Sequence, residues 1–422
     1  MILREVNRVR EGQKNVPKLR FKGYEDAWEQ RRLEEIFLKI RNAFVGTSTP
    51  YYVEKNQGGH FYIESNNVKH GKINHDTEVF INEEFYQNQK DKWLKTGDIV
   101  MVQSGHVGHS AVIPEYLNNS AAHALIMFQE YKIETNPYFI NFQFQTESVR
   151  NKIDSITTGN TIKHILASDM KLFSISYTQK KEADKLGDFF ISLDNLITLH
   201  QRKYDALKAM KKTLLSKMFP KDGEDIPEIR FKGFTDAWEQ RKLGEVKDVR
   251  DGTHDSPKYI SSGYPLVTSK NLTENGLDYS DISYISEDDF LDINQRSKVE
   301  IGDIIFGMIG TIGNPVMVTS EGFAIKNVAL LKNNGIIKNS FLIHLLKSPI
   351  FTKYVNLENA GGTQKFLGLT QIRNFECLIP NEEEQVILGE FFNDVDHLIT
   401  LHQRKLEELK NMKKTLLQQM FV

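Results

Sequence analysis

The chain has 422 residues, of which 40% are hydrophobic and 26% charged, and its formal net charge is −2 at pH 7. This length predicts two or three domains, and the composition is typical of a soluble globular protein. No apolar run approaches the ~20 residues of a membrane span, the charged N-terminus does not resemble a secretory signal, and the single cysteine, Cys377, excludes an internal disulfide. We therefore expect a cytoplasmic protein without a membrane partner, and the overall charge does not indicate a nucleic-acid binder.

The opening segment of the chain returns in its second half. Residues 17–36 and 227–246 are identical at 13 of 20 positions. In the first copy Asp26 precedes Glu29 by three residues, the spacing of a capping box, which predicts a short helix. Trp28 is expected to anchor this segment to a core. The duplication indicates two tandem units, each with a short opening, a variable middle and a long closing helix.

The two middles, about 40–180 and 247–380, differ in sequence but keep matching landmarks. The matching landmarks are 65–68 with 269–272, 94–108 with 299–313, and 161–163 with 363–365. Both middles are rich in Val, Ile, Tyr and Phe, interrupted by Gly, Asn and Asp, which favours short strands and turns with a few short helices. We therefore expect each middle to fold as a compact mixed α and β domain.

The closing segments, 186–219 and 388–421, are identical at 23 of 34 positions. Their apolar residues recur at steps of three and four, which predicts helices that pack along another helix. Each helix would run about 40 residues, or roughly 60 Å. The predicted seam consists of Leu193, Leu196, His200, Leu207, Met210, Leu214, Val395, Leu398, His402, Leu409, Met412 and Leu416. His200 and His402 are either polar residues that set the register of the seam or partly buried histidines bonded to a neighbour.

No catalytic motif stands out in either middle. The glycines of 307–313 lack the GxGxxG spacing and a Walker lysine, so turns beside a strand are favoured over a phosphate-binding loop. His106 and His109 lie close together, but no second cluster has the spacing of metal ligands. The sequence therefore indicates no catalytic residue and no metal site. Two copies of one frame around divergent middles favour two related but different recognition events.

Basic and amide side chains recur around the presumed loops of both middles. Lys and Arg suit phosphates, and Asn, Gln and Arg suit base edges, so these residues are candidates for contacting nucleic acid. The simpler alternative for each is a solvated surface group. The candidates are Lys55, Asn56, Lys69, Gln103, Ser104, His106, Asn160, Lys163, His254, Lys258, Lys270, Asn271, Arg296, Lys326 and Lys365.

The order of these motifs resembles a known family. The opening PKLRFKGYEDAWEQ, the strands GDIVMVQSG and GDIIFGMIG, the Gly-Gly-Thr before the last helix and the two LITLHQRK helices are similar to the specificity subunit of type I restriction-modification systems. The resemblance covers essentially the whole chain. It implies an α+β fold, a pseudo-two-fold tandem repeat in which two globular mixed α/β target recognition domains are joined by two long antiparallel coiled-coil helices. The recognition domains would be 1–178 and 221–380, and the helices 179–220 and 381–422.

The resemblance also implies a function. Each recognition domain would read one half of a bipartite, asymmetric target in double-stranded DNA, while the helices set the spacing and dock two methyltransferase subunits for adenine N6 methylation. The chain itself would be non-catalytic and would bind no cofactor. The methyltransferases would use S-adenosylmethionine, and two restriction subunits, where they join, would use ATP and Mg²⁺. Residues 251–254, DGTH, resemble one common kind of recognition domain, whereas the first middle has VGTS at 45–48, so the two half-sites should differ.

Two other interpretations stay open at the level of sequence. A structural adaptor, whose coiled coil pairs two protein-binding domains, would need no DNA and no methyltransferase. A single-chain nuclease or methyltransferase would need catalytic motifs that the sequence does not display.

Overall fold

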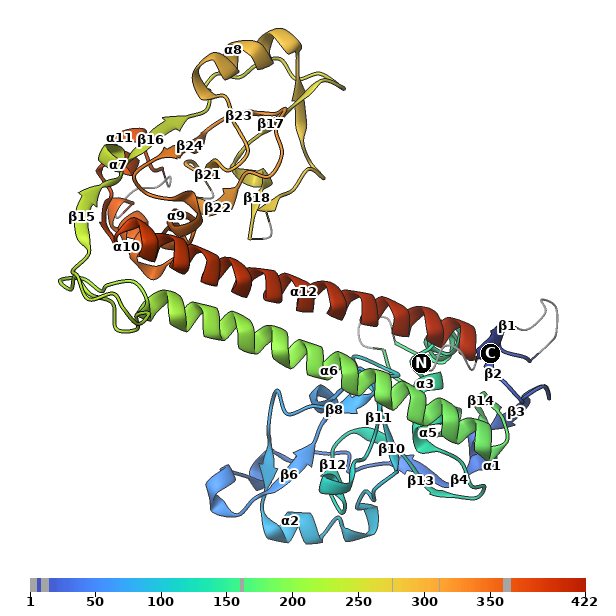
Figure 1. Ribbon diagram of the computed structural model, residues 1–422. Helices are drawn as coiled ribbons and strands as arrows, with labels where there is room; N and C mark the ends of the chain where they lie inside the picture. The colour runs from blue at the N-terminus through green and yellow to red at the C-terminus, as the bar shows by residue number, and fades with distance from the viewer. Residues whose placement is uncertain (1–5, 9–14, 160–162, 275, 311, 360–365) are drawn as a thin grey trace. The chain divides into compact units, whose positions relative to one another are not determined.

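The computed structural model describes residues 6–8, 15–159, 163–274, 276–310, 312–359 and 366–422 (Figure 1). The chain divides into two compact units. Unit 1 consists of Met1–His200 with Lys405–Val422, and unit 2 consists of Gln201–Arg404. Each unit therefore holds one variable middle and a part of both closing helices.

Two small sheets form the framework of unit 1. Their strands are β4 (Phe37–Asn42), β5 (Tyr52–Val53), β6 (His60–Ile63), β9 (Phe80–Ile81), β10 (Ile99–Val102), β11 (Ser110–Val112), β12 (Ala121–Ala122) and β13 (Leu125–Tyr131). The first sheet has the order β11-β10-β13-β4 and is antiparallel. The second has the order β12-β6-β9-β5, in which β12 runs parallel to β6.

Strand β10 explains why the GDIVMV landmark is continuously apolar. Its residues Ile99 and Met101 enter one hydrophobic core, and Val100 and Val102 enter another. Successive side chains of a strand point to opposite faces of the sheet, so both faces of this sheet are covered. An alternating apolar and polar pattern is therefore not to be expected here.

Shorter elements surround these sheets. They are β1 (Val6–Arg8), β2 (Leu19–Phe21), β3 (Glu29–Arg32), α1 (Leu33–Ile36), β7 (Val68–Lys69), β8 (Lys72–Ile73), α2 (Glu83–Gln87), α3 (Pro137–Gln143), α4 (Glu147–Ile156), α5 (Ala167–Leu172) and β14 (Ser174–Tyr177). Short 3₁₀ turns lie at Thr49–Tyr51, Lys55–Gln57, Ser65–Asn67, Lys90–Lys92 and Glu115–Leu117.

Unit 2 repeats this framework with different side chains. Its elements are β15 (Glu239–Lys242), α7 (Leu243–Val246), β16 (Lys247–Asp251), β17 (Tyr264–Val267), a 3₁₀ turn (Ser269–Asn271), β18 (Leu272–Thr273), β19 (Gly276–Leu277), β20 (Ser283–Ile285), α8 (Glu287–Ser297), β21 (Ile304–Gly307), β22 (Gly313–Met317), β23 (Ala324–Ile325), β24 (Val328–Gly335), α9 (Asn339–Leu346), α10 (Pro349–Glu358), α11 (Leu369–Asn374) and β25 (Glu376–Ile379). The sheet β16-β24-β21-β22 matches β4-β13-β10-β11, and β20-β17-β23 contains the same parallel pair as β9-β6-β12. The predicted pair of mixed α and β domains is confirmed.

The closing segments form two long helices, α6 (Lys180–Lys217) and α12 (Glu382–Met420). In unit 1, Phe190 of α6 lies against Phe421, just beyond α12, with ring centroids 5.5 Å apart, and Asp194 pairs with Lys413 at 2.7 Å. In unit 2, Phe219 and Lys211 make the equivalent contacts with Phe392 and Asp396 at 6.0 and 2.5 Å. In each unit the residue numbers rise along one helix and fall along the other, so the helices run antiparallel, as predicted. Among the helices that the structure describes, none has the length and apolar content of a membrane span.

The structure buries only some of the residues predicted to form the seam. Leu193, Val395, Leu409 and Leu416 are buried, and His200, Leu207, Leu214 and His402 are partly buried. Four predicted seam residues are instead well exposed, namely Leu196 (39%), Met210 (43%), Leu398 (44%) and Met412 (38%).

The physical reason is that each helix packs against a globular domain, and the shape of that domain determines which face of the helix is buried. The buried stripe of α6 runs through Leu186, Phe190 and Leu193 and continues to the partly buried Ile197, all packed into the core of unit 1. This stripe lies one position away from Leu196. A repeat of 3.5 residues could not distinguish these neighbouring stripes, because both keep apolar residues at helical spacing.

In the repeated opening, the predicted capping signal at Asp26 and Glu29 does not start a helix: Glu29–Arg32 form β3, and the one-turn helix α1 (Leu33–Ile36) begins only after it. Residues Glu29–Arg32 pair with β14 immediately before α6, so tertiary pairing overrides the local capping signal. The expected role of Trp28 is confirmed: it is buried, and its ring lies edge-on to Phe139 at 5.5 Å. Next to it, the buried Arg20 binds both carboxylate oxygens of Glu182 in the first turn of α6, at 2.6 and 2.8 Å.

Candidate nucleic-acid interface

The landmark shared by residues 65–68 and 269–272 has a structural role. Asn271, predicted to contact DNA, is buried: its Oδ1 accepts the N–H of Thr268 at 3.0 Å, and its Nδ2 donates to the carbonyl oxygens of Asp278 and Asp281 at 3.1 and 3.3 Å. Asn67 makes the same three kinds of bond in unit 1. The prediction for Asn271 is therefore wrong, because its amide groups are used to hold a loop that follows β17.

In unit 2, the end of β16 carries a polar cluster that we call the Asp251 cluster, made of Asp251, His254, Arg296 and Asn327. The Asp251 carboxylate is buried; its Oδ1 accepts a hydrogen bond from Arg296 Nη2, and its Oδ2 lies 2.9 Å from His254 Nε2. His254 Nδ1 lies 2.8 Å from Asn327 Oδ1. Two hydrogen bonds raise the pKa of His254 above its ordinary value. The bond with Asn327 has the larger effect and the bond with Asp251 the smaller. The cluster therefore joins a buried acid to an arginine and a histidine whose side chains reach solvent.

Sequence reasoning selected His254 and Arg296 as candidate contacts but did not select Asp251. The available signal was the DGTH segment itself, whose glycine also has a structural explanation. A Cβ on Gly252 would lie 2.2 Å from the carbonyl oxygen of Ile325, so a larger residue would clash with the backbone of β23. Beside the cluster, Lys326 Nζ donates to Ser256 Oγ at 2.7 Å, and Lys258 is exposed.

Unit 1 places different chemistry at the equivalent position. The correspondence is marked by an isolated β-bridge next to the parallel strand pair of each domain. This bridge joins Phe44 to His123 in unit 1 and Thr253 to Lys326 in unit 2. Glu64 pairs with His123 at 3.6 Å and accepts a hydrogen bond from Tyr52 Oη at 2.7 Å.

We call Ser48, Tyr52, Glu64 and His123 the Glu64 cluster. Ser48 Oγ lies 2.9 Å from Tyr52 Oη. The carboxylate raises the pKa of His123, and His123 in turn lowers the pKa of Glu64. Sequence reasoning selected none of these four residues, because three separate segments of the chain bring them together.

A second group of predicted residues meets in unit 1. Backbone hydrogen bonds join Gly105 to Lys163 at 3.2 Å and Ile165 to Gln103 at 3.0 Å, so the loop with Gln103, Ser104 and His106 lies beside Lys163. His106 and Lys163 are exposed, and the Lys163 ammonium group is 3.5 Å from Asp154.

The remaining predicted residues are scattered over the two units. Lys55 and Lys270 are exposed but pair with Glu78 and Asp281, both at 2.8 Å. Asn56 is exposed and Lys69 partly buried. Asn160 and Lys365 lie outside the described residues.

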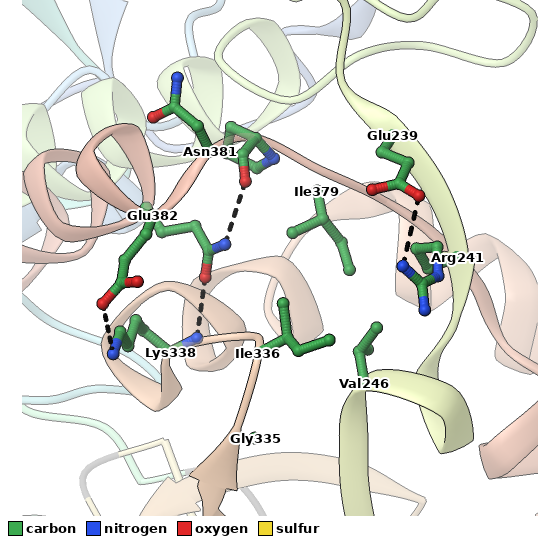
Figure 2. Close-up of a pocket in the computed structure, with 11 residues that line it drawn as sticks. Glu239, Arg241, Val246, Gly335, Ile336, Lys338, Ile379, Asn381 and Glu382 are labelled. Atoms are coloured by element: carbon green, nitrogen blue, oxygen red, sulfur yellow. Dashed lines mark hydrogen bonds and ion pairs between the residues drawn. The ribbon is translucent and has the colours of Figure 1, made fainter.

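A cavity of about 330 Å³ lies in unit 2 beside the start of α12 (Figure 2). Its charged side chains pair with one another: Lys338 with Glu382 at 2.7 Å, and Arg241 with Glu239 at 3.3 Å. Gln385 accepts the N–H of Lys338 at 2.8 Å. The polar groups that line the cavity are thus bonded to one another and help to hold the start of α12 in place. Across the part of the chain that the structure describes, no group of three or more His, Cys, Asp or Glu residues could hold a metal ion.

Comparison with known proteins gives one consistent result. The family model described as "Type I restriction modification DNA specificity domain" matches residues 25–209 and again 235–411. The MjaVIII type I restriction enzyme specificity subunit of Methanocaldococcus jannaschii is 22% identical over 412 residues, which cover 92% of this chain and 91% of that protein. The MjaIX specificity subunit of the same organism is 22% identical over 337 residues, 76% of each chain.

Solved structures agree on the fold. The S subunit of a type I restriction-modification system from M. genitalium superimposes with a TM-score of 0.61 at 16% identity, covering 96% of this chain and 99% of that one. A chain from a study of complex assembly and conformational transition of the type I system gives a TM-score of 0.52 at 16% identity, covering 92% and 96%. With one copy of the specificity domain in each half, this chain belongs to the family of type I restriction-modification DNA specificity proteins.

Proposed function

We propose that this specificity subunit selects a bipartite, asymmetric DNA target, with unit 1 reading one half and unit 2 the other. One observation carries this proposal: two domains of the same framework carry different polar clusters at the same position. Unit 1 offers Glu64 and His123 there, and unit 2 offers Arg296, His254 and Lys326. Base edges are distinguished by their donors and acceptors, so different side chains on equal frames select different sequences.

The long helices support the second part of the proposal. α6 has 38 residues and α12 has 39, and each contributes to both units. We propose that they set the spacing between the two half-sites. An insertion in either helix would then change the gap between the half-sites and leave the bases of each half unchanged.

The exposed apolar residues of the helices suggest where partners bind. They occur at equivalent positions of the two copies: Leu196 with Leu398, Leu199 with Leu401, and Met210 with Met412, all more than a third exposed. Large apolar side chains repeated on an exposed helix face are typical of a protein interface. We propose that each unit docks one methyltransferase subunit on this face, so that two join the complex.

In this arrangement the chain supplies specificity, and the chemistry belongs to its partners. The methyltransferase subunits would bind S-adenosylmethionine and methylate adenine at N6, and restriction subunits, where they join, would use ATP and Mg²⁺. The complex would work in the cytoplasm, a reducing compartment that suits the single thiol of Cys377.

The test is to express the chain with the methyltransferase subunit of the same cell and to map N6-methyladenine across the DNA by single-molecule sequencing. We expect a split, asymmetric motif with a fixed gap. A complex that forms and binds S-adenosylmethionine but leaves the DNA unmethylated would instead support the adaptor interpretation.

A further inference from the structure

The Asp251 cluster contains a buried acid in a place where a DNA-reading surface would ordinarily avoid negative charge. Asp251 is 4% exposed, whereas the side chain of Arg296 is 63% exposed and that of His254 is 47% exposed. A carboxylate repels phosphate, so its presence needs an explanation. The carboxylate is instead buried beneath Arg296 and His254, and each of its two oxygens has one of these side chains as a hydrogen-bond partner.

We propose that Asp251 is a positioning residue for the second half-site: it holds Arg296 and His254 in one fixed orientation from which Arg296 reads a guanine edge. This inference rests on the proposed function of unit 2 in DNA recognition. It adds a specificity-determining residue that itself touches no base.

The geometry divides the two carboxylate oxygens between two partners. Oδ1 accepts from Arg296, at the C-terminal end of α8, and Oδ2 from His254, in the loop after β16. A second bond, from Arg250 Nη1 to the carbonyl oxygen of Arg296 at 3.3 Å, also ties α8 to β16. A free arginine side chain would lose rotamer entropy on binding a base. Because Arg296 is already held in place before binding, less entropy would be lost when it binds.

The donors of Arg296 are suited to a base edge. A guanidinium group has five N–H donors in a planar fork. Among the described residues, Asp251 is the one side chain to which Arg296 donates a hydrogen bond, through Nη2. The remaining N–H groups can meet the O6 and N7 acceptors of guanine, the most frequent specific contact of arginine in the major groove.

The test compares Asp251→Asn with Glu245→Gln in the complex with the methyltransferase. Glu245 is the control because it is an acidic residue of the same unit whose ion pair, with Arg241 at 3.3 Å, lies near the surface and involves neither Arg250 nor Arg296. Methylation rates are measured on duplexes with the intact target and with each half-site altered singly. We expect Asp251→Asn to reduce discrimination at the second half-site by roughly 10-fold or more, the scale of one bidentate base contact, with the first half-site unchanged.

Three results would overturn the proposal. Asp251→Asn could behave like Glu245→Gln, or it could reduce discrimination equally at both half-sites. Alternatively, Arg296→Lys, which keeps the charge but loses the planar fork, could retain full discrimination. Thermal unfolding and assembly with the methyltransferase check that the variants fold, and Arg296→Lys tests the same contact if Asp251→Asn does not fold.

The proposed function fails separately from this inference. A wild-type complex without any sequence preference would disprove DNA selection by this chain. A wild-type complex that reads a split target, together with an unaffected Asp251→Asn variant, would disprove only the positioning role.

Discussion

Replacing Arg20 by Met tests how the repeated opening holds the recognition domain to its helix. The guanidinium group makes a bidentate pair with Glu182, and both side chains are almost completely buried, at 2% and 1% exposure. The indole N–H of Trp28 donates to the same carboxylate at 3.1 Å. Arg20→Met would leave a buried carboxylate with hydrogen bonds but without a counter-ion.

The expected loss is large because a buried charge without its partner cannot be solvated. Breaking a buried ion pair from one side costs about 3–5 kcal/mol. With a urea dependence of about 1–3 kcal/mol per molar, the unfolding midpoint of unit 1 should fall by at least about 1 M. Replacing both partners, as in Arg20→Met with Glu182→Gln, should restore part of the stability, because no charge then remains buried and the glutamine oxygen can still accept the indole N–H of Trp28.

The assay is urea unfolding of the full chain, followed by tryptophan fluorescence and far-UV circular dichroism. Arg31→Met is the control, since Arg31 pairs with Glu29 on the surface at 2.6 Å and should cost less than about 1 kcal/mol. An unchanged midpoint for Arg20→Met would refute the reasoning. A double variant less stable than the single one would show that packing, rather than the buried charge, explains the effect.

Three further predictions concern unit 2. Gly252→Ala should destabilise it by about 1–3 kcal/mol in thermal unfolding, since the Cβ would meet the backbone of Ile325; an unchanged melting temperature would show that β23 can shift. Burial lowers the pKa of His344 to about 4, from 6.5 in an unfolded chain, so the neutral form stabilises the fold. The corresponding stability, about 3 kcal/mol, is present above pH 6.5 and should be lost as the pH falls toward 4, while His344→Gln should flatten this dependence in urea titrations at each pH. Leu398→Asp should weaken capture of the methyltransferase in a pull-down without changing the melting temperature, because the side chain is 44% exposed; full capture would place the docking face elsewhere.

The architecture was predictable because it depends on patterns that repeat along the chain. The duplicated closing segments predicted two long helices, and these occur at Lys180–Lys217 and Glu382–Met420. Trp28 was expected in a core and is buried there. Burial of an aromatic ring and burial of a long apolar stripe are both driven by the free energy of transferring apolar groups out of water. That free energy depends on residue type, so the sequence alone is enough to predict both.

The candidate site was less predictable. Asn271 has the chemistry of a base reader, but its amide is fully used within its own loop. His123 and Glu64 were not selected, although they form the centre of the cluster in unit 1. Whether a polar side chain has a structural or a recognition role depends on which hydrogen-bond acceptors lie within about 3 Å of it. The spacing of residues along the sequence carries little of that information.

The sequence by itself determined the tandem repeat, the two mixed domains, the two long helices and the family resemblance, because local periodicity and internal identity are properties of the string. The tertiary structure alone decided which helix face is covered and which polar groups meet. Leu196 is exposed and Ile197 packs toward the core because the domain surface is placed against one stripe and not its neighbour. Asp251 and Arg296, 45 residues apart, meet because β16 and α8 are brought together only when the domain closes its core.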